Sequence, residues 1–209
     1  MVSGETPTRA AYYRVMAGAL PPETLVVTAL GNASYLWAAI RDRAENFYVE
    51  DAMGLALPLA LGLAVARPDR RVVAVEGDGG LLMHMGGLVT VGAASPPNLT
   101  VLLIQNGVHA ASGGQALTNA GLDFAALAAA AGLAGARNVA GADDFAAALG
   151  EALAAPGPSF LALATAPDLE VVVPPAGFDP VVTRRRFQDA IDAPRYLPTL
   201  FGGGRLVER

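Results

Sequence analysis

Residues 72–106 constrain the fold more than any other part of the chain, because they read as strand, glycine turn, helix and strand. Residues 72–75 and 99–104 are continuous runs rich in Val, Leu and Ile, the pattern of strands that are buried on both faces of a parallel sheet. A Gly-Asp-Gly-Gly turn at 77–80 ends the first strand, and a helix is expected over 81–94. Such a unit brings the ends of both strands to one edge of the sheet.

The same alternation of strands and helices continues along the chain. Further strands are expected at 24–29, 46–49, 136–139 and 159–165, and further helices at 12–20, 34–40, 53–66, 123–131 and 143–155, the last with Asp143 as its N-cap. This order predicts an α/β fold with three layers, α/β/α, around a mainly parallel sheet. In such sheets ligands bind beyond the carboxyl ends of the strands.

We expect one domain over residues 1–166 and a tail over residues 167–209. The tail is rich in proline, and the arginines at 184–186 are expected to open a short helix. These arginines are typical of a solvated helix face, and a contact with an anionic substrate or partner is the alternative. We expect the tail to pack on the domain or on a partner, with a frayed end near the glycines at 202–204.

Composition excludes several classes of function. The chain has no cysteine, and all 14 of its Lys and Arg residues are arginine. This excludes thiol nucleophiles, disulfides, Schiff-base lysines and the lysine of a phosphate-binding P-loop. A formal net charge of −5 gives no support for nucleic-acid binding.

Hydrophobic residues make up 53% of the chain and charged residues 16%. Such an apolar composition predicts that part of the surface is buried in a subunit interface. No apolar run reaches the roughly 18–20 residues of a membrane span, and residues 1–14 lack the apolar core of a signal peptide. We therefore expect a cytoplasmic protein that does not enter a membrane.

Two side chains that carry oxygen ligands follow neighbouring strands of the predicted sheet. Asp78 lies in the glycine turn, and Asn106 follows the strand at 99–104. Mg²⁺ prefers hard oxygen ligands and combines one or two from the protein with phosphate oxygens, and the backbone carbonyl of Val108 can complete the protein set. Because the turn lacks side chains where phosphate oxygens would approach, the spacing predicts a site for magnesium and a diphosphate.

The segment from Gly77 to Asn106 resembles the Gly-Asp-Gly…Asn motif of thiamine diphosphate-dependent enzymes, in the domain that binds the diphosphate end of the cofactor. Asp-Arg-Ala-Glu-Asn-Phe-Tyr at 42–48, Met-Gly-Leu-Ala at 53–56 and Asn-Gly-Val-His…Gly-Gly-Gln at 106–115 look like the sulfopyruvate and phosphonopyruvate decarboxylases. The resemblance runs from about residue 25 to residue 166. It implies the thiamine-diphosphate-binding fold, with thiamine diphosphate and Mg²⁺ as cofactors.

The resemblance also implies roles for individual residues. Mg²⁺ would bind to Asp78, Asn106 and the carbonyl of Val108. The N–H groups of Gly79 and Gly80 would hold the diphosphate, Met53 would support the bent cofactor, and the backbone around Asp51 would contact its aminopyrimidine. The full set of residues expected at the cofactor is Asp51, Met53, Gly77, Asp78, Gly79, Gly80, Asn106, Val108 and His109.

His109 is the predicted catalytic acid or base. It follows the metal loop in a polar stretch, and imidazole exchanges protons near neutral pH. An ordinary surface histidine is the alternative, whereas His84 is expected to be packed in a helix or an interface. Candidate substrate contacts are Asn32, Ser34, Ser112 and Gln115, although Ser112 and Gln115 fit a role in stabilising the loop equally well.

The chain departs from these decarboxylases at several positions. Tyr35 stands where the relatives carry arginine, Asp51 where they carry glycine, and Gln105 where an Asn-Asn pair usually begins. Ala110 and Ala111 replace the Glu-Ser of the phosphonopyruvate enzymes. These differences indicate a smaller, less polar site and leave open which 2-oxo acid is bound.

At 209 residues we expect one large domain and no room for a second. Thiamine enzymes need one, because its glutamate protonates the aminopyrimidine, and we do not expect Glu50 or Glu76 to replace it. The chain therefore resembles the β subunit of a heteromeric 2-oxo acid decarboxylase, completed by an α subunit that carries this glutamate. Two alternatives remain: a subunit of a thiamine-dependent carboligase or other lyase, and a cofactor-binding subunit without turnover.

Overall fold

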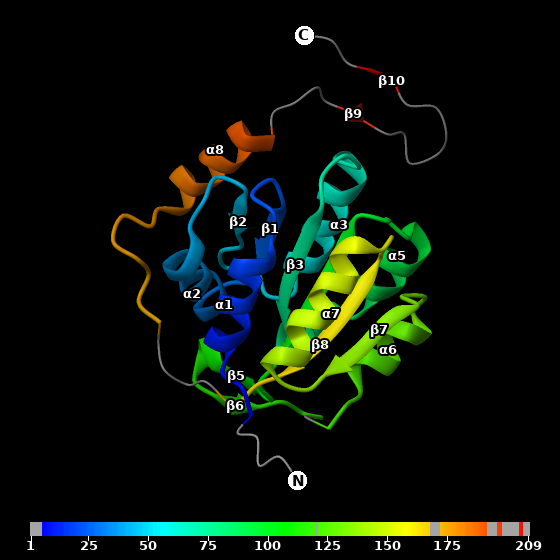
Figure 1. The fold of residues 1–209 in the computed structure, drawn as a ribbon. Helices are drawn as coiled ribbons and strands as arrows, with labels where there is room; N and C mark the ends of the chain where they lie inside the picture. Colours follow the sequence, from blue (N-terminus) through cyan, green and yellow to red (C-terminus); the bar gives the residue numbers. More distant parts are fainter. Residues whose placement is uncertain (1–5, 120, 168–171, 192–195, 198–204, 207–209) are drawn as a thin grey trace.

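A six-stranded parallel sheet forms the centre of the molecule (Figure 1). The computed structural model describes residues 6–119, 121–167, 172–191, 196–197 and 205–206. The strand order is β2-β1-β3-β4-β8-β7. The strands are β1 (Leu25–Thr28), β2 (Asn46–Tyr48), β3 (Val72–Gly77), β4 (Leu99–Gln105), β7 (Gly135–Val139) and β8 (Ser159–Ala164).

Helices cover both faces of this sheet and bury its alternating side chains. Val72 and Ala74 of β3 belong to a core under α3 (Ala56–Ala66), α5 (Gly86–Ala94) and α6 (Phe124–Ala130). Val73 and Val75 point to the other face and pack with α1 (Arg9–Ala19), α2 (Asn32–Arg41) and α7 (Ala142–Ala154). The predicted α/β/α architecture is confirmed.

The remaining elements include one helix that adds Phe187 to the core of Val72 and Ala74. They are α4 (Asp78–Met83), the antiparallel pair β5 (Val108–His109) and β6 (Gln115–Ala116) with the 3₁₀ turn at Ala110–Ser112 between them, α8 (Pro180–Ile191), and the pair β9 (Tyr196–Leu197) and β10 (Arg205–Leu206). Within the described residues, no helix has the length and apolar character needed to cross a membrane.

Several predicted helix boundaries were wrong. The helix expected over 81–94 is two helices, α4 and α5, and His84 lies at the break between them with an exposed side chain. The glycine pair at 86–87 that follows has low helix propensity, which explains the break. Helix α3 begins at Ala56 rather than at Met53, so Met53 lies in the preceding turn.

Two further corrections concern helix starts. Helix α7 is capped by Gly141, and Asp143 lies in its first turn, where a carboxylate favours the helix dipole without acting as the N-cap. Helix α8 begins at Pro180, a residue suited to a first helical turn. The arginines at 184–186 therefore lie within α8 instead of opening it.

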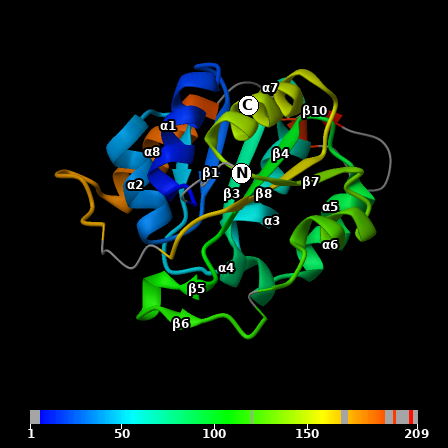
Figure 2. The ribbon, with the colours of Figure 1, turned by 60° about the horizontal axis from the view of Figure 1, so that its bottom comes forward.

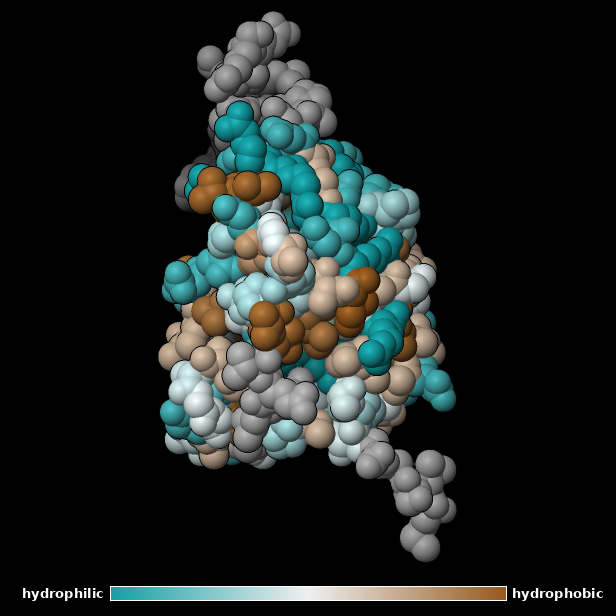
Figure 3. Space-filling model, turned by 90° about the vertical axis from the view of Figure 1, so that its left-hand side faces the viewer, coloured by the Kyte–Doolittle hydropathy of each residue, from teal (hydrophilic) through white to brown (hydrophobic). Residues whose placement is uncertain are grey.

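The described part of the predicted tail packs on the sheet domain through aromatic contacts. The ring of Phe178 lies 5.5 Å from that of Tyr35 and 5.2 Å from that of Tyr48, and the rings of Phe187 and Phe47 are 5.3 Å apart. On the face that carries α2 and α8, hydrophobic groups lie around the middle and the upper part is mostly hydrophilic (Figure 3). The division at residue 166 stays a prediction, and the glycines at 202–204 lie outside the described residues.

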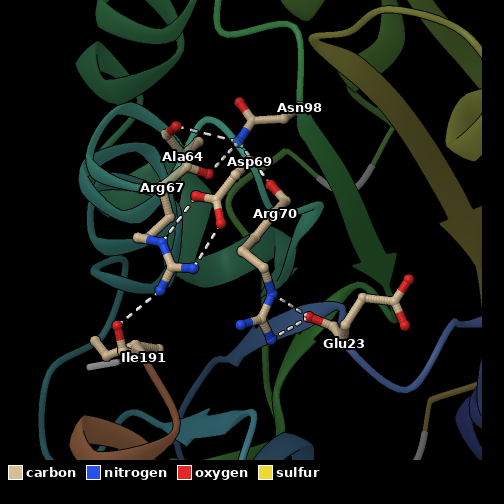
Figure 4. A network of polar contacts seen from close by, with 7 residues as sticks. All are labelled: Glu23, Ala64, Arg67, Asp69, Arg70, Asn98 and Ile191. Atoms are coloured by element: carbon tan, nitrogen blue, oxygen red, sulfur yellow. Dashed lines mark hydrogen bonds and ion pairs between the residues drawn. The ribbon is translucent and has the colours of Figure 1, made fainter. Parts of the chain in front are cut away.

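A network of polar contacts ties the segments that precede β1, β3 and β4 at the amino edge of the sheet (Figure 4). The side-chain amide of Asn98 donates to the carbonyl oxygens of Ala64, Arg67 and Arg70 at 2.8–3.1 Å. Arg67 pairs with Asp69 through two contacts of 2.6 and 2.8 Å, and it also donates to the carbonyl of Ile191 at the end of α8.

The carboxyl edge, in contrast, contains a crevice between β1 and β3. The chain leaves β1 toward α2 on one face, whereas it leaves β3 toward α4 and α5 on the other. In open parallel sheets such a switch point is where ligands bind. Figure 2, in which this edge comes forward, shows α4 and the β5–β6 hairpin side by side beyond the ends of β3 and β4.

Candidate functional site

A cavity lies at this switch point and is lined by the loops that follow β1, β3 and β4. The segment at 77–80 was predicted to be a turn before a helix that starts at residue 81, but it is the end of β3 and the first turn of α4. This segment, still called the glycine turn below, supplies one wall, and Asn32 and Ala33 at the start of α2 supply another. Asn106 and the hairpin residues that follow it close a further side, while Met53 and Gly54 approach from the turn before α3. The predicted metal and diphosphate residues are therefore brought together, as the parallel order of the strands requires.

Asp78 and Asn106 point into this cavity from adjacent strand ends. In the β3–β4 register, Gly77 pairs with Ile104, so both side chains emerge just beyond the last paired residues. Asp78 is 3% exposed and Asn106 is 7% exposed. The Asp78 carboxylate accepts the N–H of Gly79 and the N–H of Gly107, each at 2.8 Å.

The buried Asp78 carboxylate suits a hard cation. Burial raises the pKa of Asp78, while the two N–H donors and the nearby His109 oppose that rise. None of the ion pairs among the described residues includes Asp78. The same part of the chain gathers no group of three His, Cys, Asp or Glu side chains. A metal here would depend on Asp78, the amide oxygen of Asn106 and backbone carbonyls, a set that fits Mg²⁺.

Two glycines bring the glycine turn at 77–80 into direct contact with the turn that carries Met53. Gly54 has φ +78°, and a Cβ atom built on it would lie 2.5 Å from the carbonyl oxygen of Gly80. A Cβ atom on Gly80 would lie 3.2 Å from the backbone nitrogen of Gly54. The two backbones therefore touch without an intervening side chain, which places Met53 beside the glycine turn.

His109 contacts the same turn at Gly79. A Cβ atom added to Gly79 would lie 2.7 Å from Nδ1 and Cε1 of His109, so the imidazole packs directly on the glycine. The side chain is half-buried and lines the cavity. It is thus placed in the candidate site and not on a remote surface.

Glu76 is a buried residue of the cavity for which the sequence indicated no role. It is 1% exposed, and its carboxylate accepts the N–H of Gly77 at 3.1 Å and the N–H of Ala56 at the start of α3 at 3.2 Å. Burial raises the pKa of Glu76 to about 7, although these backbone donors oppose the shift. The side chain thus ties the end of β3 to α3 directly beneath the glycine turn.

We expect Glu76→Gln to change the pH dependence of stability in the metal-free chain. The folded chain keeps a proton on Glu76 between pH 4.5 and about 7, whereas the unfolded chain releases it. The wild type should therefore lose stability relative to the variant as the pH rises through this window, by roughly 3 kcal/mol in total. Urea unfolding from pH 4 to 8 with EDTA measures this, with Glu23→Gln as the exposed control. If the difference in unfolding free energy between wild type and Glu76→Gln did not change with pH, Glu76 would not be protonated in the folded chain as we expect.

The other residues predicted from the sequence divide between the cavity and its surroundings. Asn32 and Ser112 line the cavity, and the Asn32 amide oxygen also accepts the N–H of Val172 at 3.1 Å. Ser34 does not line it, because its hydroxyl is fully buried against Thr28 and the carbonyl of Ala29.

Gln115 and Asp51 also lie outside the cavity lining. Gln115 is exposed and exchanges hydrogen bonds with Ser112 across the hairpin turn, at 3.1 and 3.2 Å. Asp51 is exposed and has φ +54°, a left-handed conformation that favours glycine and that aspartate tolerates better than most residues. This backbone conformation explains why the related decarboxylases carry glycine at the position of Asp51.

Arg9 lines the cavity and was missed by the sequence analysis. The helix was expected to begin at residue 12, but α1 begins at Arg9 after Thr8, whose hydroxyl accepts the N–H of Ala11. Residues 9, 12, 13 and 16 are the buried positions of α1. This is the spacing of one helix face, so a helix extended back to Thr8 would have revealed an arginine on the buried stripe.

The fold and the site together define a class of protein: a three-layer α/β domain with a glycine-lined cavity at the carboxyl edge of its parallel sheet. A family model described as "Thiamine pyrophosphate enzyme, C-terminal TPP binding domain" matches residues 30–163. The chain belongs to this family.

Curated relatives include two kinds of decarboxylase. The chain is 38% identical over 192 residues to a phosphonopyruvate decarboxylase of Streptomyces viridochromogenes, covering 92% of this chain and 48% of that protein. It is 42% identical over 113 residues to a sulfopyruvate decarboxylase subunit beta of Methanothermobacter thermautotrophicus, covering 54% of this chain and 60% of the relative. The chain thus spans about half the length of the phosphonopyruvate decarboxylase.

A solved structure supports the same fold. A thiamine diphosphate-dependent 4-hydroxybenzoylformate decarboxylase of Rhodococcus jostii RHA1 superposes with a TM-score of 0.70 at 25% identity. The match covers 81% of this chain and 34% of that one.

Proposed function

We propose that the chain is the diphosphate-binding β subunit of a heteromeric, thiamine diphosphate- and Mg²⁺-dependent 2-oxo acid decarboxylase. The observation that carries the proposal is the buried Asp78 carboxylate beside Asn106 and an open glycine turn at the switch point of the sheet. The relatives named phosphonopyruvate decarboxylase and sulfopyruvate decarboxylase subunit beta support this reaction class.

Each part of the cavity has a separate task in this proposal. Asp78, Asn106 and the carbonyl of Val108 would hold the Mg²⁺, and the glycine turn at 77–80 would receive the diphosphate. Met53 is 36% exposed, which leaves its side chain available for contact with the cofactor. The bound cofactor supplies the electron sink that a decarboxylation needs. The described residues supply orientation and proton transfer.

His109 is proposed to hold or move a proton at its imidazole nitrogens. Its ring packs on Gly79 and borders the cavity, so it is within the site that the substrate would enter. Ala110 and Ala111 beside it add no polar group, which makes His109 the titratable side chain of this hairpin that lines the cavity.

We expect His109→Gln to lower kcat of the holoenzyme by about a hundredfold, because it removes a proton-transfer group. The affinity for thiamine diphosphate should change little, since the metal and diphosphate contacts remain. Steady-state decarboxylation and cofactor titration measure the two effects. Glu23→Gln changes an exposed side chain just before β1, at the amino edge of the sheet and away from the cavity, and serves as the control. Unchanged kcat in His109→Gln would contradict the role.

The partner subunit is the second part of the proposal. In this proposal a separate α subunit contributes the aminopyrimidine-binding domain and its glutamate, and the relative named sulfopyruvate decarboxylase subunit beta supports such a division. Exposed hydrophobic side chains flank the break between α4 and α5 and the turn before α3, where a subunit can pack: Met53, Leu55, Met83, Met85 and Val89.

Expression of the chain with and without a candidate α subunit tests this arrangement. We expect the chain alone to bind thiamine diphosphate with Mg²⁺ but to release no CO₂ from a 2-oxo acid, and the pair to release it. Decarboxylation by the chain alone at the rate of the pair would overturn the proposal of a shared site.

A further inference from the structure

Arg9 is a buried arginine at the carboxyl edge of the sheet. It is 5% exposed and is the first residue of α1. The hydroxyl of Tyr12 donates to the carbonyl of Ala164 at 3.1 Å, and the N–H of Ala166 donates to the carbonyl of Pro7 at 3.3 Å. These contacts hold the start of α1 beside the end of β8, and Arg9 lines the cavity there.

The guanidinium of Arg9 forms no ion pair among the described residues, although its charge acts on the nearby hydroxyl of Tyr13. Its Nε is buried without a hydrogen bond, and none of the ion pairs in the described part of the chain includes it. Arg67, by contrast, pairs with Asp69. An unpaired buried cation is unfavourable, because the lost hydration is not replaced. Because no carboxylate of the described residues forms an ion pair with Arg9, its burial favours binding of an anionic ligand.

Two other features of the cavity favour an anion at the same place. Helix α2 has ten residues and begins in the cavity wall at Asn32 and Ala33. Its N-cap, Gly31, contributes no side-chain acceptor, so the positive end of the helix dipole is not neutralised by a capping side chain. The glycine turn at 77–80 lines the same cavity as Arg9.

We propose that Arg9 is a diphosphate-binding residue, which would donate to phosphate oxygens in the cavity it shares with the glycine turn. This rests on the proposed function in taking the diphosphate as the resident ligand. A diphosphate and the Asp78 carboxylate carry more negative charge than one Mg²⁺ balances. Arg9 is the one arginine among the described residues that line the cavity, and it offsets this excess. Its planar guanidinium can donate two parallel hydrogen bonds to phosphate oxygens.

The test measures binding of inorganic pyrophosphate with Mg²⁺ by calorimetry, which requires neither catalysis nor a partner. Arg9→Met should weaken this binding about tenfold to a hundredfold, because it removes charge-assisted hydrogen bonds. Arg9→Lys should give an intermediate loss, since it keeps the charge without the fork of donors. Arg14→Met removes an exposed arginine from the same helix and should leave the affinity unchanged.

Thermal unfolding separates this role from a structural one. The ligand-free Arg9→Met chain should unfold at the wild-type temperature or above it, because an unpaired buried cation has been replaced by an apolar side chain. A lower midpoint combined with wild-type pyrophosphate affinity would show a packing role and overturn the proposal.

A further comparison distinguishes the two anionic groups that Arg9 can bind, the diphosphate and the acid group of the substrate. If Arg9→Met binds pyrophosphate normally and instead raises KM for the 2-oxo acid, Arg9 contacts the acid group of the substrate and the diphosphate assignment is wrong. If the wild-type chain fails to bind magnesium pyrophosphate, the assignment also fails. Normal pyrophosphate binding with the expected Arg9→Met loss, but without decarboxylation by any subunit pair, would overturn the proposed function alone.

Discussion

Asp78→Asn is expected to abolish magnesium-dependent binding of thiamine diphosphate, with an affinity loss of more than about a hundredfold. Asp78 is the carboxylate that points into the cavity beside Asn106, and a neutral amide binds Mg²⁺ far more weakly. Removal of residues that merely support a metal ligand already lowers affinity by about 10–100-fold, so loss of the ligand itself has a larger effect. Cofactor titration at several Mg²⁺ concentrations measures the change.

Asp189→Asn is the control for this prediction, because it removes an exposed carboxylate from α8. The Asp78→Asn chain should remain folded without metal, since the substitution also removes a buried charge whose pKa is raised by burial. A thermal unfolding curve in EDTA checks this. If the variant keeps its magnesium-dependent affinity, the metal assignment of Asp78 is wrong.

Gly54→Ala is expected to lower the free energy of unfolding by about 2–5 kcal/mol. The residue has φ +78°, which is unfavourable for any residue with a Cβ atom, and that atom would lie 2.5 Å from the carbonyl oxygen of Gly80. Relief of the clash requires one of the two turns to move, so the affinity for magnesium pyrophosphate should fall as well. Urea denaturation and calorimetry measure the two effects.

The matched substitution for Gly54→Ala is Gly62→Ala in α3, the helix that follows the Met53 turn. A Cβ atom on Gly62 has no neighbour within 4 Å, and alanine in a helix interior should stabilise the chain by about 0.5–1 kcal/mol. A loss of unfolding free energy in Gly54→Ala together with a gain in Gly62→Ala would support the close contact between the Met53 turn and the glycine turn. A loss at Gly54 below about 1 kcal/mol would contradict it.

Local sequence patterns were sufficient to predict the sheet and to place Asp78 and Asn106 together at its carboxyl edge. The apolar runs that became β3 and β4 reveal buried parallel strands without any knowledge of the rest of the chain, and Asp78 and Asn106 then follow from where those strands end. The resemblance to thiamine diphosphate enzymes added the name of the ligand, which the spacing alone does not contain.

The features that were missed depend on contacts between distant segments. The hydrogen bond from Ala56 to Glu76 and the contact of Gly54 with Gly80 join residues from different elements. Arg9 reaches the cavity because α1 is held at the end of β8, more than 150 residues away in the sequence. Hydrophobic periodicity indicates only which face of a helix is buried, and not which residues that face contacts.

The polar network around Asn98 affects which parts of the chain tolerate substitution. Its hydrogen bonds hold backbone carbonyls at the amino edge of the sheet, on the side away from the cavity. Anchoring and ligand binding are thus assigned to opposite ends of the same strands. The 3₁₀ turn at Ala110–Ser112 and the segment around Asp51 can therefore be changed to reshape the cavity entrance, while the scaffold that keeps the strands in register is left intact.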